Sequence, residues 1–302
     1  MSLAGHIETL YPLTITRIKK VRDVQRMLTS DGRALCCKTY NFPDSEVDFI
    51  ADILIQLVES GFPYGPRIVA TRDRRLWAKR NDKPVMVTNW IKGRSPNFET
   101  PSEWKQAIRT LASFHRYAQF PILREVPAGR ERYTTLTSVI ADYRTTLQHV
   151  QDIPVHAFIF LCDEATRYLG EPKSMEAVKC EAAVRAWVHG DYNYPNLILD
   201  RKGFMRLIDF ENTSLQARMT DLAHILHRNA AWDCDELLRW IDYYDRFRPL
   251  SAEDRFLLYA LLHVPYPLVR AIRSKISRDK WISTMPPGRK IDQYISGLRK
   301  II

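Results

Sequence analysis

The sequence predicts an α+β protein in which a small antiparallel sheet with one helix precedes a larger, mainly helical region. Three observations lead to this prediction. Apolar and polar residues alternate on both sides of Ser30-Asp31-Gly32, as in a β-hairpin. Apolar residues recur at helical spacing through most of the chain beyond residue 102. Residues 91–101 (IKGRSPNFETP) contain Gly and two Pro without periodicity, so we expect lobes at 1–90 and 102–302 joined by this linker.

The elements expected in the N-terminal lobe follow from local patterns. The first hairpin covers VQRMLTSDGRALCCKTY (24–40) and turns at Asp-Gly. Asp44-Ser45 precede an apolar-periodic run that ends at Gly61, which predicts a helix of about four turns at ~3.6 residues per turn. Polar turns separate RIVAT, LWAKR and VMVTNW, which predicts a meander of three short strands within 67–90.

The C-terminal lobe begins with a helix over EWKQAIRTLASFHRYA (103–118), which Ser102 is expected to cap. The exception to its helical character is a second hairpin, in which NLILD and MRLIDF flank the turn RKG. This hairpin places Asn196 and Asp209 at the ends of paired strands.

Composition predicts a globular protein of the cytoplasm. The chain has 302 residues, of which 45% are hydrophobic. Its longest apolar stretches, within 158–162 and 256–264, are shorter than the ~20 residues of a membrane helix, so we expect no membrane span. The first ten residues lack the basic and apolar regions of a signal peptide. The five cysteines show no CxxC spacing, and we expect reduced thiols.

The formal net charge is +10, and the excess is concentrated near the C-terminus, where residues 268–302 hold nine Lys/Arg against two Asp. Such a basic region is either a solvated helical face or a surface for an anionic partner. No aromatic-interleaved RNA motif or zinc-finger spacing accompanies the charge, so no specific nucleic-acid partner is expected.

Polar residues with the spacing of a phosphoryl-transfer site lie around the second hairpin. VHGDYNYPN places Asp191 five positions before Asn196, and Asp209 follows the hairpin within IDFE. Kinase-type sites take their base and one metal ligand from an Asp-x4-Asn loop, and the other metal ligand from an Asp just beyond a short hairpin. The carboxylate and the amide carbonyl suit Mg²⁺, which prefers oxygen ligands. The alternative is that each of these residues only caps or turns the chain.

Two motifs, HGDYNYPN and LIDFE, resemble the HGDxxxxN and IDxE signatures of the aminoglycoside phosphotransferase superfamily, which includes choline and homoserine kinases. This resemblance implies a bilobal, protein-kinase-like fold. NWIKGR, LASFHRYA and HGDYNYPN together look like the CotS-type spore-coat kinase-like proteins of endospore-forming bacteria. The resemblance covers nearly the whole chain, and HGDxxxxN followed by IDFE is its most specific part.

Roles for individual residues follow from the resemblance. Asp191 is expected to be the catalytic base, Asn196 and Asp209 the magnesium ligands, and Lys38 the lysine that contacts ATP phosphates. Glu46 is the expected ion-pair partner of Lys38, ahead of Asp48 and Glu59. The main chain at Asn89, Trp90 and Ile91 is expected to bind adenine, while His189 and Asp221 support the catalytic loop. Taken alone, Lys38 could instead be an edge-strand lysine.

The resemblance implies an ATP- and Mg²⁺-dependent phosphotransferase that acts on a hydroxyl of a small-molecule acceptor. Gly190 stands where regulated protein kinases carry Arg, and no APE-like sequence follows Asp209, so a peptide substrate is not expected. No glycine occurs between Gly5 and Gly32, so the family's glycine-rich phosphate loop is missing. The alternative is therefore a weak or inactive kinase-shaped protein of the spore coat, bound to other coat components or to an anionic polymer.

Two further sets of residues remain open at this point. The acceptor site could include aromatic and acidic residues that could equally be ordinary helix packing: Tyr192, Trp232, Asp233, Tyr243 and Tyr244. His224 and His227 lie on one predicted helical face, where packing or capping explains them better than a metal site without a third ligand.

Overall fold

The computed structural model describes residues 2–119, 125–151, 154–274 and 277–302. These residues form two compact units, and each consists of several chain segments. Unit 1 comprises residues 1–96, 124–130 and 194–211, and unit 2 comprises the remainder. Both contain helices and strands, with the five-stranded antiparallel sheet in unit 1 and most helices in unit 2, which confirms the predicted α+β class.

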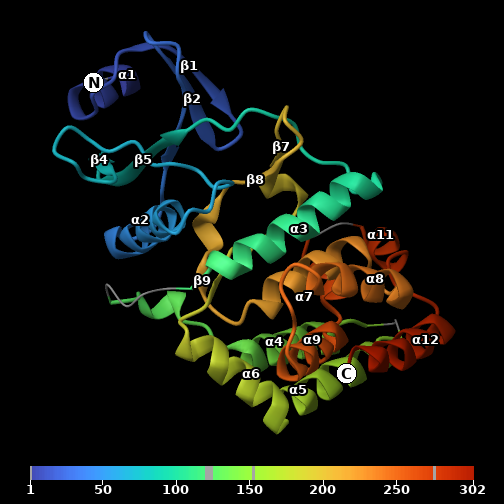
Figure 1. Cartoon of the computed structure of the whole chain (residues 1–302). Helices are drawn as coiled ribbons and strands as arrows, with labels where there is room; N and C mark the ends of the chain where they lie inside the picture. Colours follow the sequence, from blue (N-terminus) through green and yellow to red (C-terminus); the bar gives the residue numbers. More distant parts are fainter. Residues whose placement is uncertain (1, 120–124, 152–153, 275–276) are drawn as a thin grey trace. The chain divides into compact units, whose positions relative to one another are not determined.

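Unit 1 is built on a sheet with strand order β1-β2-β3-β5-β4. Its elements are α1 (Leu3–Leu10), β1 (Ile15–Val21), β2 (Val24–Thr29), β3 (Ala34–Thr39), α2 (Asp44–Glu59), β4 (Ala78–Arg80) and β5 (Lys83–Asn89). The first hairpin is confirmed as β2 and β3, with Gly32 in the left-handed region at φ 80°. The helix predicted after Asp44-Ser45 is confirmed as α2 (Figure 1).

Two parts of the N-terminal prediction were wrong. The segment 67–71 was expected to be a strand, but Ile68 makes only an isolated bridge to Thr88. Residues 3–10 were not expected to be helical, yet Ser2 caps α1 by accepting a hydrogen bond from the Gly5 N–H at 3.1 Å. Helix α1 supplies Ile7 to a buried core, and its C-cap residue Tyr11 also packs there, which explains why so short a helix is stable.

The alternation of β3 decides where Lys38 points. Leu35 and Cys37 face the core that also contains Ile7 and Tyr11. Successive side chains of a strand point to opposite faces, so Lys38 lies on the other face of the sheet. Strand β3 has β2 and β5 as neighbours, and Lys38 is therefore not on an edge strand.

The second hairpin also belongs to unit 1. It is formed by β7 (Leu197–Leu199) and β8 (Met205–Leu207), which confirms the predicted hairpin with shorter strands than expected. A 3-10 turn at Tyr194–Asn196, which was not predicted, precedes it. The Leu207 N–H donates to the Tyr64 carbonyl at 2.9 Å. Gly93 passes so close to this hairpin that a Cβ there would lie 2.3 Å from the Leu199 carbonyl oxygen.

Unit 2 is mainly helical and carries one short strand pair, β6 (Trp187–Val188) with β9 (Ser214–Leu215). Its helices are α3 (Pro101–Tyr117), α4 (Leu136–Gln148), α5 (His156–Leu169), α6 (Pro172–Ala183), α7 (Met219–Asn229), α8 (Cys234–Asp245), α9 (Ala252–His263), α10 (Tyr266–Arg273), α11 (Arg278–Ile282) and α12 (Gly288–Leu298). Ser102 was the expected cap of the first helix, but Thr100 occupies the N-cap position and Pro101 starts the helix.

Of the helices in the described part of the chain, none combines the length and apolar character needed to cross a bilayer. The basic C-terminal region includes residues 275–276, which lie outside the described residues.

Candidate active site

In unit 1, Lys38 is held between two carboxylates. Its Nζ lies 2.6 Å from Oδ1 of Asp209 and 3.1 Å from Oε1 of Glu211. Burial alone would lower the pKa of Lys38, but Asp209 and Glu211 outweigh this effect and raise it. The lysine is therefore a fixed cation, and the two carboxylates of IDFE share it.

The expected ion pair between Lys38 and Glu46 was wrong. Glu46 instead accepts hydrogen bonds from the Arg130 guanidinium, at 3.1 Å from Nε and 2.7 Å from Nη2. Arg130 is buried and also donates to the Glu211 carbonyl. Glu46 lies in the first turn of α2, where the helix dipole favours a negative charge. Two nitrogens of the Arg130 guanidinium donate to its Oε2, so the arginine occupies the place expected for the lysine.

The residues expected to bind metal flank the second hairpin. Asn196 ends the turn before β7, and its carbonyl accepts the Ile208 N–H at 3.0 Å. Asp209 lies two residues beyond β8 and has φ 64°, in the left-handed region. This conformation is uncommon for a residue with a side chain, although Asp and Asn adopt it more readily than most. It directs the Asp209 carboxylate to Lys38 immediately after the strand ends.

In unit 2, Asp221 fixes the backbone just before Asp191. One carboxylate oxygen accepts the His189 N–H at 2.7 Å and the other accepts the Gly190 N–H at 3.0 Å. Burial raises the pKa of Asp221 to about 7; the two N–H bonds oppose this rise and the neighbouring Asp191 adds to it. Both N–H groups remain satisfied in either protonation state, because each oxygen keeps an acceptor lone pair.

Only glycine fits at position 190. Its φ is 79°, and a Cβ there would lie 2.1 Å from the carbonyl oxygen of Asn212. The chain thus passes Asn212 backbone to backbone, which explains in steric terms why no arginine stands before Asp191. His189 is fully buried and packs edge-on to Tyr192 at a centroid distance of 6.0 Å.

Helix α7 supplies two neighbours of Asp191 that the sequence analysis did not identify. Nη1 of Arg228 lies 3.4 Å and Nε2 of His224 lies 3.6 Å from Oδ1 of Asp191. Burial, followed by the charge of Arg228, lowers the pKa of His224 to about 3, so the imidazole is neutral near pH 7. The candidate base therefore faces the positive charge of Arg228.

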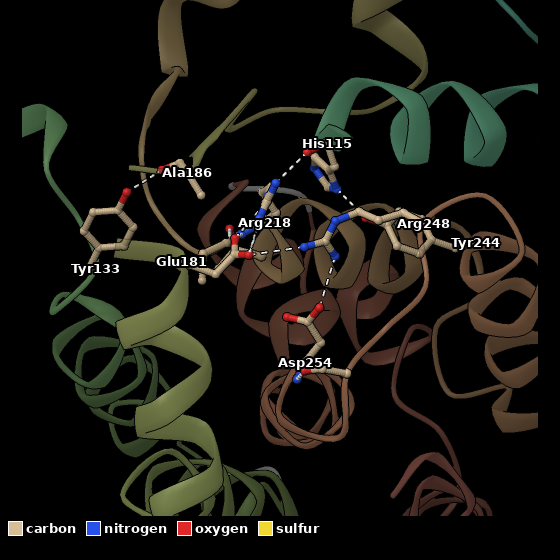
Figure 2. Close-up of polar contacts among 11 residues, drawn as sticks. His115, Tyr133, Glu181, Ala186, Arg218, Tyr244, Arg248 and Asp254 are labelled. Carbon is tan, nitrogen blue, oxygen red and sulfur yellow. Dashed lines mark hydrogen bonds and ion pairs between the residues drawn. The ribbon is translucent and has the colours of Figure 1, made fainter. Parts of the chain in front are cut away.

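A buried polar network, part of which is drawn in Figure 2, contacts Asp221 through His115. His115 lies between Asp221 and Tyr244, with its Nε2 3.5 Å from the Asp221 carboxylate and its Nδ1 2.6 Å from the Tyr244 hydroxyl. Burial, followed by the charges of Arg248 and Arg218, holds the pKa of His115 well below its usual range. In the neutral tautomer that fits both contacts, Nε2–H donates to Asp221 and Nδ1 accepts from Tyr244.

The network continues through ion pairs that involve no exposed side chain. Arg218 donates to Glu181 at 2.6 Å and to the His115 carbonyl at 2.7 Å. Arg248 bridges Glu181 and Asp254, at 3.2 Å from each. Figure 2 shows the two guanidinium groups converging on Glu181. Each buried charge thus has an opposite partner, which burial requires.

The proposed adenine-binding segment ends β5 in unit 1. The Asn89 N–H donates to the Arg67 carbonyl at 3.0 Å and the Trp90 N–H donates to the Ala34 carbonyl at 2.9 Å. Within the described ranges, the Ile91 N–H makes no hydrogen bond to another residue. Of the three N–H groups, that of Ile91 is the one available to a ligand.

The structure supports packing for most of the residues considered for the acceptor site. Tyr192 and Tyr244 are fully buried, and Trp232 is nearly so. The Tyr192 hydroxyl donates to the Ala107 carbonyl at 2.8 Å. Asp233 caps α8 by accepting the Glu236 N–H at 3.0 Å.

Comparison with known proteins identifies the family and the fold. The model of the APH family, described as the phosphotransferase enzyme family, matches residues 14–257. The protein therefore belongs to this phosphotransferase family, and it has the kinase-like fold of the aminoglycoside phosphotransferase superfamily.

Solved structures share this fold at low sequence identity. An aminoglycoside phosphotransferase from Alicyclobacillus acidocaldarius subsp. acidocaldarius DSM 446 has a TM-score of 0.80 and 18% identity, over 99% of this chain and 96% of that one. An amicoumacin kinase in complex with AMP-PNP, Ca²⁺ and Ami has a TM-score of 0.61 and 12% identity, over 100% and 93%. A choline kinase from Cryptosporidium parvum Iowa II has a TM-score of 0.59 and 14% identity, over 99% and 95%.

Proposed function

We propose that this protein transfers the γ-phosphoryl group of ATP, with Mg²⁺, to a hydroxyl of a small-molecule acceptor. The main support for this proposal is the position of Lys38, whose ammonium group contacts Asp209 at 2.6 Å and Glu211 at 3.1 Å. Phosphoryl transfer needs a lysine and metal-binding carboxylates close together, because both act on one phosphate chain. A protein with only a structural role has no need to hold Asp209 in the left-handed region in order to place its carboxylate next to Lys38.

The donor set fits magnesium. Asp209 and Glu211 offer carboxylate oxygens that already hold one cation, and Asn196 adds an amide from the start of the same hairpin. Hard Mg²⁺ prefers such oxygens and keeps water on its remaining positions. Asp209 and Asn196 would hold the ion, and when bound it neutralises charge on the phosphates.

In the proposed reaction, Asp191 orients the acceptor hydroxyl and accepts its proton. The acceptor oxygen forms a bond to the γ-phosphorus, the bond from that phosphorus to the bridging oxygen breaks, and ADP leaves with the bonding electrons. In the nucleotide complex, Lys38 would contact the phosphates and give up its present contact with Asp209. Asp221 and His189 keep the backbone before Asp191 in position.

Two assignments in the nucleotide site are refined by the contacts within unit 1. The Ile91 N–H would donate to adenine, since those of Asn89 and Trp90 already donate within the protein. Glu46 would act through Arg130, which also donates to the Glu211 carbonyl. The amicoumacin kinase to which this chain is similar was solved with AMP-PNP, which supports the use of a nucleotide.

Asp209→Asn tests the metal site. ATP with Mg²⁺ should raise the melting temperature of the wild type, because a bound ligand stabilises the folded state by mass action. The variant should lose most of the metal-dependent part, since the amide lacks the charge that offsets magnesium dehydration. Asp23→Asn, an exposed turn residue, is the matched control. Equal shifts in wild type and Asp209→Asn would remove Asp209 from the ligand set.

Asp191→Ala tests the base. Phosphotransfer or ATP hydrolysis should fall by at least ~100-fold, the scale of a positioned general base. The ATP-dependent thermal shift should stay close to that of the wild type, because the proposed nucleotide contacts belong to other residues. Unchanged turnover in this variant would contradict the assignment.

The motifs NWIKGR, LASFHRYA and HGDYNYPN further support a proposal that the protein acts in sporulation, in the cytoplasm or in association with the spore coat. A fluorescent fusion followed through sporulation would test the location. Coat association that persists in Asp191→Ala, together with no measurable turnover in the wild type, would favour a scaffold that binds coat components or an anionic polymer.

A further inference from the structure

Unit 2 contains two neighbouring cavities, one of which lies next to the candidate base. The first has a volume of about 180 Å³ and is bordered by Gly190, which precedes Asp191, and by His224 and Tyr266. The second has a volume of about 300 Å³ and is bordered by Arg270 and Arg273. Tyr143 and Tyr266 border both cavities, so the two are adjacent. Together they offer space for a small molecule that extends from Gly190 to the arginines of α10.

The inner cavity has a neutral wall of aromatic and imidazole rings. The ring centroids of His224 and Tyr266 are 5.0 Å apart, and those of Tyr143 and Tyr266 are 6.3 Å apart. Burial lowers the pKa of His227, which also borders this cavity, to about 4. Like His224, it is uncharged near pH 7. This wall suits an apolar or ring-shaped part of a ligand.

Arginines supply the charge around the two cavities. Arg270 is exposed and forms no ion pair with a carboxylate of the described residues. Arg273 pairs with Asp142 at 2.7 Å, but the Asp142 side chain is 64% exposed, so water screens this pair strongly. Arg228 completes the set beside Asp191.

The carboxylates here all lie beside other groups. Asp191 faces Arg228, and Asp221 is buried and accepts two backbone N–H groups. The pair of Asp142 with Arg273 is weak, but the charge of Arg273 next to Asp142 opposes a cationic ligand there. A polycationic acceptor would need carboxylates free to bind its ammonium groups, and it would meet arginines instead. Like charges facing one another cost binding energy, whereas Arg binds carboxylate and phosphate groups through charge-assisted hydrogen bonds.

We propose, on the basis of the function proposed above, that the acceptor is an anionic alcohol. Its carboxylate or phosphate binds Arg270 and Arg273, its central part packs against Tyr143 and Tyr266, and its hydroxyl points to Asp191. The preference for an acidic over a cationic acceptor is thus set by α10, outside the motifs that define the family.

A set of four sugars with one ring skeleton tests the proposal: glucuronate, glucose 6-phosphate, glucose and glucosamine. Binding is measured by thermal shift at fixed ionic strength, with and without ATP and Mg²⁺, and turnover by ADP release. Glucuronate or glucose 6-phosphate should bind more tightly than glucose, and glucosamine most weakly. The stronger of the two acids tells whether the arginines select carboxylate or phosphate.

The variants are Arg270→Gln, Arg270→Gln with Arg273→Gln, and the control Arg289→Gln, an exposed arginine of α12. Loss of charge-assisted hydrogen bonds should weaken binding of the acid by about 10- to 100-fold in the double variant, with a smaller loss in the single one. Glucose binding should not change, and Arg289→Gln should behave as wild type. The single variant guards against a folding defect, because Arg270 has no carboxylate partner to lose.

The outcomes separate this inference from the proposed function. A wild type that shows no response to ATP and Mg²⁺ contradicts the proposed function itself. An intact ATP response with glucosamine bound as tightly as the acids, an acid preference that survives in the double variant, or no response to any of the four sugars overturns the anionic acceptor alone.

Discussion

Replacing Gly190 by alanine should damage the loop that carries Asp191, for two separable reasons. The residue has φ 79°, and its added Cβ would lie 2.1 Å from the Asn212 carbonyl oxygen and 2.8 Å from the carbonyl carbon. The left-handed conformation alone costs a residue with a side chain about 1–2 kcal/mol. The contact with Asn212 involves backbone on both sides, so no change of rotamer relieves it.

Relief of this contact requires the two backbones to move apart. Real Cβ contacts are not shorter than 3.0 Å, so the gap must open from 2.1 Å by roughly 1 Å. Overpacking of this kind costs about 1–3 kcal/mol, which brings the expected loss of stability to about 2–5 kcal/mol. A 1 Å displacement of a catalytic group reduces the rate by about 100-fold, so turnover should fall on that scale.

Gly32→Ala is the matched control. Gly32 has φ 80° in the turn between β2 and β3, and a Cβ there would have nothing within 4 Å. Urea denaturation of wild type and both variants separates the conformational cost, which they share, from the contact, which only position 190 has. If Gly190→Ala is no less stable than Gly32→Ala and keeps its activity, the close approach to Asn212 does not constrain the loop.

Three further predictions follow from buried charges. Burial lowers the pKa of His227 to about 4. Between this value and the ordinary histidine pKa, the imidazole is protonated in the unfolded chain but not in the folded chain. Stability therefore falls as pH decreases, and His227→Gln should lose about 2 kcal/mol less than wild type between pH 7 and pH 5 in urea denaturation; equal losses would contradict this. Lys38→Gln leaves Asp209 without its cation, so Mg²⁺ alone should stabilise the variant more than the wild type in thermal melts, while the additional shift from ATP should shrink. Glu181→Gln removes the carboxylate shared by two buried guanidinium groups and should lower the free energy of unfolding by about 3–5 kcal/mol in urea denaturation. The control Glu164→Gln, from a pair with a half-exposed arginine, should lower it by at most about 1 kcal/mol. Similar losses in the two variants would contradict a stabilising role of Glu181 in the buried network.

The parts of the fold that could be predicted are those with a strong local pattern. The two hairpins and α2 carry their own turn residues and periodicity, and all three are present. Segment 67–71 has the composition of a strand, but only Ile68 finds a partner, at Thr88. Pairing depends on the neighbouring chain, which composition does not report. Helix α1 is short and depends on the sheet core for its stability, so its own sequence gives little signal.

The site shows the same division. The spacing of Asp191, Asn196 and Asp209 could be identified because these residues lie close together in the chain. The contact of Lys38 with Asp209 spans 171 positions, and that of Arg130 with Glu46 spans 84, so proximity in sequence could not indicate them. The role of Glu211 could have been predicted, because Glu211 is the last residue of the IDFE motif.

The composition of unit 1 from distant segments has a consequence for biosynthesis. The chain emerges from the ribosome from its N-terminus, and N-terminal domains ordinarily fold before the rest is made. Here the sheet is translated early, yet the carboxylates that neutralise Lys38 and the hairpin that packs on Tyr64 arrive only with residues 194–211. The N-terminal lobe therefore remains incomplete while residues 97–123 and 131–193 of unit 2 are synthesised, at ~5–20 residues per second. A gene fragment that ends before residue 194 would encode a sheet that lacks this hairpin and both carboxylate partners of Lys38. Such a fragment should be recovered as an aggregate or as a chaperone substrate.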